Sequence, residues 1–137
     1  MESNKMKALI NARLAGNILL ISLGLLTIFH ILVMLNVVSP EIVWGGQAGN
    51  TEVSLLTLEI VALLVTALMA VIIAAKIGYI QAGRFKVAVN IGIWIVVAYL
   101  LLNMLGNLTS GVSAESFIFA PITLILALFA LRLAIKE

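Results

Sequence analysis

Apolar residues fill four long runs of the chain, and shorter polar segments separate these runs. The runs cover residues 14–38, 53–75, 87–105 and 117–135. Each approaches or exceeds the roughly 20 residues that an α-helix needs to cross about 30 Å of hydrocarbon. Transmembrane β-strands alternate apolar and polar residues over about 10 residues, whereas segment 61–68 is almost continuously apolar. The pattern therefore predicts an all-α fold, a transmembrane four-helix bundle in a single membrane domain over residues 1–137.

The composition supports a membrane location. Hydrophobic residues make up 64% of the chain and charged residues 10%, and the mean hydropathy is +1.25. Average soluble domains are about half apolar and about a quarter charged. We therefore expect an integral membrane protein whose main partner is the lipid bilayer. The absence of cysteine excludes a disulfide-stapled secreted module and a cysteine-based metal or redox site.

The basic residues predict the orientation of the four helices. They fall into three groups, at the N-terminus, between the second and third runs, and at the C-terminal end, all on one side of a four-span protein. The positive-inside rule then places both termini in the cytoplasm and the protein in the inner (cytoplasmic) membrane. Nucleic acid is not expected as a partner, because nucleic-acid binding needs basic residues clustered on one water-exposed face. The groups are Lys5, Lys7 and Arg13; Lys76, Arg84 and Lys86; and Arg132 and Lys136.

Small and polar residues at helical spacing predict which helix faces point inward. Helices in lipid associate by close backbone approach, which small residues permit. We expect the following inward faces: Gly16, Thr27, His30 and Met34 in the first helix; Ala62, Thr66, Ala70 and Ala74 in the second; Ala88, Gly92, Tyr99, Asn103 and Gly106 in the third; and Ala120, Thr123, Ala127, Ala130 and Ala134 in the fourth.

Four polar residues on these faces lie at similar predicted depths. His30 stands ten residues before Pro40, about 15 Å from the outer helix end at about 1.5 Å per residue. The same rise places Glu59, Tyr99 and Thr123 about 9 to 10 Å below the outer ends of their helices. We therefore expect these four residues to form one polar layer in the outward half of the bundle.

Glu59 is the strongest functional candidate because it is an ionisable residue inside a span. A carboxylate at the helix centre costs about 2.5 to 3.5 kcal/mol on insertion scales, and the many Leu, Ile and Val residues of 53–75 offset this at about 0.3 to 0.6 kcal/mol each. Glu59 could form a protonatable site with His30 or Tyr99 as its partner. It could equally stay protonated and donate one hydrogen bond that fixes helix packing.

The sequence predicts no metal site and no catalytic constellation. One histidine, no cysteine, no aspartate and a single intramembrane glutamate fall short of the three or four ligands of a typical metal site. No cofactor is expected, and heme ligation by His30 is the one alternative left open. Gly45 and Gly46 lack the strand and helix that a phosphate-binding fingerprint needs around it.

Two further positions are candidates for ligand contacts. Asn103 follows Tyr99 by one helical turn, so both side chains could line a ligand site or form interhelical hydrogen bonds. Trp44 lies in the longest outward segment, beside Gly45 and Gly46. It suits either an aromatic anchor at the membrane surface or part of a cap over the polar layer.

The chain resembles a family of small bacterial four-span membrane proteins. The similar segments are 29–30, 40 and 43–46, the helix of Glu59, residues 103–107, and Pro121 to Arg132. The resemblance implies a four-helix membrane fold and a bacterial origin, and it implies no activity. A weaker similarity, to the DoxX-like four-helix membrane proteins, rests on topology and on an early glutamate in the second helix.

Three functions fit these observations. The first is a non-enzymatic bundle that binds a small apolar ligand or carries a proton-linked polar site in its outward half. The second is a structural or accessory protein that acts through membrane-protein partners, with the polar layer serving assembly. The third is a membrane enzyme that uses His30 and Glu59 as an acid/base pair on a lipid-soluble substrate.

Overall fold

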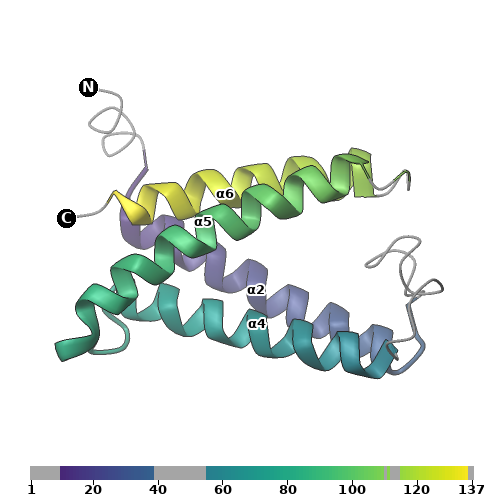
Figure 1. Ribbon diagram of the computed structural model, residues 1–137, viewed down its shortest axis with the longest axis horizontal. Helices are drawn as coiled ribbons and strands as arrows, with labels where there is room; N and C mark the ends of the chain where they lie inside the picture. The colour runs from purple at the N-terminus through teal and green to yellow at the C-terminus, as the bar shows by residue number, and fades with distance from the viewer. Residues whose placement is uncertain (1–9, 39–54, 110, 112–114, 136–137) are drawn as a thin grey trace.

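Four long helices form a bundle in the part of the chain that the structure describes. A computed structural model describes residues 10–38, 55–109, 111 and 115–135. These contain α2 (Ala12–Met34), α4 (Leu55–Lys76), α5 (Lys86–Thr109) and α6 (Ala120–Ala134) (Figure 1). A 3-10 turn, η2 (Gly83–Phe85), precedes α5, and a π-helical turn, η3 (Glu115–Phe119), precedes α6. For these described residues, the predicted all-α fold with four long helices is confirmed.

The helices form two pairs. Helix α2 packs along α4, and α5 packs along α6; the pairs are joined by contacts of α2 with α6 and of α4 with α5. The start of α2, the turn between α4 and α5, and the end of α6 lie at one end of the bundle (Figure 1). The two pairs diverge toward the opposite end.

The outer surface of the bundle is apolar. Each of the four helices is long and apolar enough to cross a membrane, and only 22–33% of the most apolar window of each is buried. Large side chains such as Ile21 (65% exposed) and Leu102 (68% exposed) therefore point away from the protein. Such a surface suits contact with lipid, because hydrocarbon tails are as apolar as these side chains.

Two helices end in Schellman motifs. Asn36 adopts a positive φ of 60° after α2, and Gly78 adopts 93° after α4. In each motif the next residue donates its N–H back to the helix: Val37 to the Leu32 carbonyl at 2.9 Å, and Tyr79 to the Ala74 carbonyl at 2.9 Å. Helix α2 thus ends at Met34, although the apolar run continues to residue 38, because the backbone turns at Asn36.

Two glycines mark close helix contacts. A Cβ atom on Gly16 of α2 would lie 2.6 Å from Cγ2 of Ile77, and one on Gly92 of α5 would lie 3.1 Å from Cδ1 of Ile72. Both positions were predicted to face inward, and both are buried. Glycine here lets the neighbouring helix approach at a distance that a larger side chain would block.

The predicted inward face of α5 is wrong apart from Gly92. The remaining predicted positions, Ala88, Tyr99, Asn103 and Gly106, are exposed. The buried face consists of Gly92, Ile93, Val96, Val97 and Leu100. In a membrane helix the lipid-facing positions are as apolar as the packed ones, so the polar residues do not identify the packed side.

Arg132 ties the last helix to the start of the first. Its Nε donates a hydrogen bond to the Ile10 carbonyl at 2.6 Å, and the residue is only 8% exposed. Within the part of the chain that the structure describes, its Nη1 has no hydrogen-bond partner. Arg132 is therefore a packing residue as well as a charge at the basic end.

Candidate functional site

His30 and Glu59 form a buried pair between α2 and α4. His30 lies one turn before the end of α2, and Glu59 lies in the second turn of α4. His30 Nδ1 is 2.5 Å from Glu59 Oε2. Glu59 is fully buried and His30 is 4% exposed. The structure therefore places the imidazole, rather than Tyr99, beside the carboxyl group.

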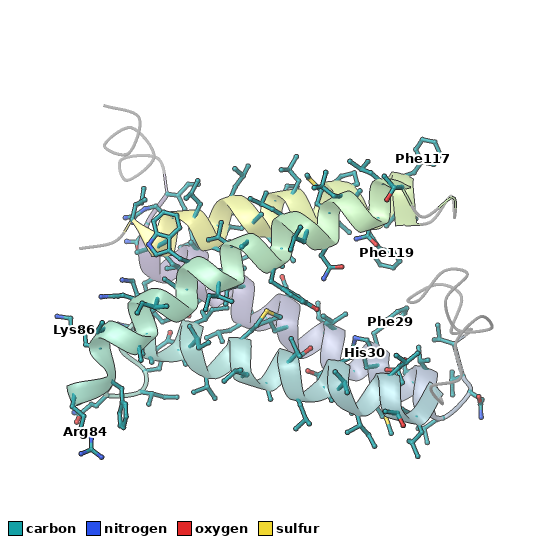
Figure 2. All side chains as sticks on the ribbon, in the orientation of Figure 1. Phe29, His30, Arg84, Lys86, Phe117 and Phe119 are labelled. Atoms are coloured by element: carbon teal, nitrogen blue, oxygen red, sulfur yellow. The ribbon has the colours of Figure 1, made fainter. Side chains whose placement is uncertain are left out.

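The surroundings of the pair favour a net charge of zero. The described cations lie at the opposite end of the bundle, where Figure 2 labels Arg84 and Lys86. An isolated charge in an apolar interior is costly, whereas a pair can hold one proton between its members and remain neutral overall. The arrangement can therefore store, accept or release a proton.

An aromatic contact lies beside the pair and joins the two halves of the bundle. The rings of Phe29 on α2 and Phe119 in η3 face each other across the region where the helix pairs diverge (Figure 2). Their centroids are 6.3 Å apart, with an angle of 56° between the ring planes. Such tilted aromatic pairs add about 0.5 to 1.5 kcal/mol beyond their burial. Nothing in the apolar pattern distinguished these rings from their neighbours, so the sequence analysis missed this contact.

Thr123 belongs to a separate polar contact, between α5 and α6. Asn107 Nδ2 donates to Thr123 Oγ1 at 3.3 Å, and Thr123 Oγ1 donates to the Phe119 carbonyl at 2.6 Å. The four residues of the predicted polar layer therefore do not form one cluster: Tyr99 belongs to neither hydrogen-bonded pair, and Thr123 is bonded to Asn107, which was not predicted. His30 and Glu59 join α2 to α4, whereas Asn107 and Thr123 join α5 to α6.

The other candidates lie apart from the buried pair. Tyr99 is 41% exposed and lines an apolar hollow of about 170 Å³ between α4 and α5. Asn103 is also exposed. Trp44 lies outside the described residues. Trp94 of α5 is 50% exposed.

The described parts of the chain contain no cluster of metal-ligating side chains. Residues 10–38, 55–109, 111 and 115–135 contain no group of three or more His, Cys, Asp or Glu side chains that could hold an ion. The His30–Glu59 pair supplies at most two ligands, one fewer than catalytic zinc sites take from the protein. The chemistry that the described site itself can perform is hydrogen bonding and proton exchange.

The opposite end of the bundle carries a second polar cluster. The guanidinium carbon of Arg13 lies 4.6 Å from the centroid of the Tyr79 ring, and the Tyr79 hydroxyl donates to Asn17 Oδ1 at 2.7 Å. The side chain of Arg13 holds the pKa of Tyr79 below its ordinary value of 10.0, chiefly by a hydrogen bond. The contacts connect α2 to the segment that follows α4.

Comparison of the chain with known protein families, with curated proteins and with solved structures finds no match. The functional argument therefore rests on the geometry of the described residues.

Proposed function

We propose that the chain is a non-enzymatic, multi-pass protein of the inner membrane that carries a proton-linked site at His30 and Glu59, with both termini in the cytoplasm. The observation that supports this most strongly is the 2.5 Å contact between two fully or almost fully buried ionisable side chains. Ionisable residues inside membrane spans are rare, and they commonly mark proton relays or ligand sites.

The position of the pair fits this role. It lies toward the end of the bundle where the helix pairs diverge, away from the basic end (Figure 2). In the proposed orientation this is the outward half of the membrane. The Phe29–Phe119 contact joins the two halves of the bundle next to His30 in the chain, and we infer that it links the protonation of the pair to the relative position of the halves.

Infrared spectroscopy of the folded protein tests this proposal. Difference spectra between about pH 5 and about pH 8, the range in which histidine changes charge, report carboxyl groups that gain or lose a proton. We expect a carboxyl band that disappears in Glu59→Gln and shifts in His30→Ala. Thr66→Ala is the matched control, because Thr66 is a buried polar residue that donates to the Ala62 carbonyl of its own helix. Identical difference spectra for the wild type and Glu59→Gln would show that the pair exchanges no proton.

A second candidate function is that of an accessory protein with a membrane partner. Asn103 is exposed on the apolar helix α5, less than two turns before its end at Thr109, and an amide facing hydrocarbon is costly without a hydrogen-bond partner. A partner helix on this face of α5 would supply one. Site-specific photocrosslinking from position 103 in native membranes should then capture one protein in stoichiometric amount, whereas crosslinking to lipid alone would exclude this function.

A further inference from the structure

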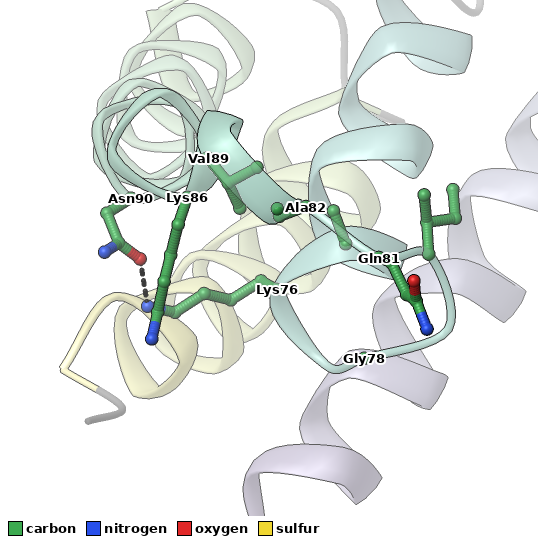
Figure 3. Close-up of a pocket in the computed structure, with 10 residues that line it drawn as sticks. Lys76, Gly78, Gln81, Ala82, Lys86, Val89 and Asn90 are labelled. Carbon is green, nitrogen blue, oxygen red and sulfur yellow. Dashed lines mark hydrogen bonds between the residues drawn. The ribbon is translucent and has the colours of Figure 1, made fainter.

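A basic hollow lies at the turn between α4 and α5. It has a volume of about 640 Å³, and its lining includes Lys76 at the end of α4, Gln81 in the turn, and Lys86 and Asn90 at the start of α5. Figure 3 shows the ends of the Lys76 and Lys86 side chains on the same side of the hollow as the Asn90 amide. The described lining residues include no acidic side chain.

The polar groups of this hollow suit an anion. Lys76 Nζ donates to Asn90 Oδ1 at 2.5 Å (Figure 3). This contact uses the oxygen of the Asn90 amide as the acceptor. The Asn90 Nδ2 group therefore points away from Lys76 (Figure 3). The two ammonium groups and the Asn90 amide thus lie together on one side of the hollow. A phosphate offers these donors several acceptor oxygens and a compensating negative charge.

The same helix seam continues as an apolar hollow. The second hollow, of about 170 Å³, is lined by Leu68 and Met69 of α4 and by Gly92, Ile95 and Tyr99 of α5, among others. It begins within one helical turn of the basic hollow on both helices. From Asn90 to Tyr99 the rise along α5 is about 13 Å, which approaches half of the roughly 30 Å hydrocarbon thickness.

We propose that the α4–α5 seam binds one anionic phospholipid. The phosphate lies in the basic hollow, against Lys76, Lys86 and Asn90, and one acyl chain follows the seam into the hollow beside Tyr99. The order of polar and apolar surfaces along the seam matches that of a phospholipid, with the charged group at the helix ends and the apolar part toward the membrane centre. The inference uses the membrane placement of the proposed function and is independent of the His30–Glu59 pair.

Native mass spectrometry of the protein in detergent tests the proposal, with dioleoyl phosphatidylglycerol as the anionic probe and dioleoyl phosphatidylcholine as the zwitterionic one. We expect one preferred phosphatidylglycerol per chain. Lys76→Gln and Lys86→Gln should each weaken its binding about fivefold, because a basic residue near a lipid surface contributes about 1 kcal/mol. Arg84→Gln is the matched control, since it removes a charge from the same turn without belonging to the lining of the hollow.

The apolar half of the site has its own pair of variants. Leu68→Trp places a larger side chain in the second hollow and should weaken phosphatidylglycerol binding. Leu64→Trp makes the same change at an equally exposed position of α4 outside the lining, and should not. Glu59→Gln should bind the lipid as the wild type does, so a failure of this proposal and a failure of the proton-linked site can be told apart.

Three results would overturn the proposal. Equal loss of binding in Arg84→Gln and Lys86→Gln would show a diffuse surface charge instead of a site. Equal binding of phosphatidylglycerol and phosphatidylcholine would show that the lysines do not select an anionic lipid. Stabilisation by inorganic phosphate or glycerol phosphate alone, unaffected by Leu68→Trp, would identify a soluble phosphate compound as the ligand.

Discussion

A carboxyl group buried in an apolar helix bundle needs a partner, and Glu59 is paired with His30. The sequence indicated Glu59 because it is the one glutamate within an apolar run. It could not choose between His30 and Tyr99, because helix periodicity gives the face of a residue only within its own helix. The choice is made by the packing of α2 against α4, which leaves Tyr99 exposed on another seam.

Removing one member of the pair should cost more than removing both. His30→Leu or Glu59→Leu removes one side of this buried contact and leaves the other ionisable group in an apolar interior, and we expect each to lower the free energy of unfolding by about 3 to 5 kcal/mol. Replacing both residues by leucine should recover most of that loss, because a packed apolar pair needs no polar partner. Equilibrium unfolding in detergent measures the free energy of unfolding of the two single variants and the double variant. Additive losses in the double variant would contradict a direct interaction.

At the basic end, Tyr79 should ionise more readily than an ordinary tyrosine. The side chain of Arg13 lowers its pKa from 10.0, because a cation favours the phenolate. The sign follows from linkage: a pKa that is lower in the folded state adds stability at high pH, and this stability is lost as the pH falls through the folded value.

The absorbance of tyrosinate measures this effect. The titration difference between the wild type and Tyr79→Phe should have a midpoint below 10.0, and Arg13→Gln should move it upward. Arg84→Gln should leave it in place, since Arg84 stacks on Phe85 instead. An unchanged titration midpoint in Arg13→Gln would exclude the Arg13–Tyr79 contact in solution.

At the scale of helices, the number and approximate positions of the elements follow from the apolar runs, but their ends and faces follow less well. The end of α2 is fixed by Asn36, a residue that tolerates a positive φ. The inward face of α5 could not be predicted, because lipid and protein neighbours select the same apolar residues. Glycine was a partial guide, since Gly16 and Gly92 lie at close helix contacts whereas a Cβ on Gly106 would meet nothing within 4 Å.

The contact of Gly16 with Ile77 can be tested by adding one methyl group. Gly16→Ala places a Cβ 2.6 Å from Ile77 Cγ2, and we expect a loss of about 1 to 3 kcal/mol from overpacking. Gly24→Ala adds the same group to the same helix where nothing lies within 4 Å, so it should be neutral or slightly stabilising. In an Ile77→Ala background, the penalty at Gly16 should largely vanish. Equal effects of the two alanines would refute close packing at Gly16.

At the scale of the whole molecule, the charges and the buried pair lie at opposite ends. The described cations surround the start of α2, the α4–α5 turn and the end of α6, while His30 lies toward the other end (Figures 1 and 2). This separation follows from the order of the polar segments between successive helices of the bundle. It is the basis of the proposed orientation, in which the basic end faces the cytoplasm.

Cysteine labelling tests that orientation cleanly, because the chain has no cysteine of its own. Gln81→Cys lies at the basic end and Thr109→Cys at the end of α5 nearer the other side, and both side chains are exposed. With a membrane-impermeant maleimide on intact cells, we expect labelling of Thr109→Cys alone. Gln81→Cys should react only after the membrane is opened. The reverse pattern would place the termini outside.

The central claim, that His30 and Glu59 share a proton inside the bundle, is most directly tested by solid-state NMR in lipid bilayers. His30 is the only histidine in the chain, so labelled histidine gives the nitrogen signals of one imidazole. We predict an Nδ1 signal typical of a strong hydrogen bond to a carboxyl group, which changes when Glu59 becomes glutamine and is unaffected by Asn103→Ala. An imidazole spectrum that is the same in the wild type and in Glu59→Gln would contradict the shared proton.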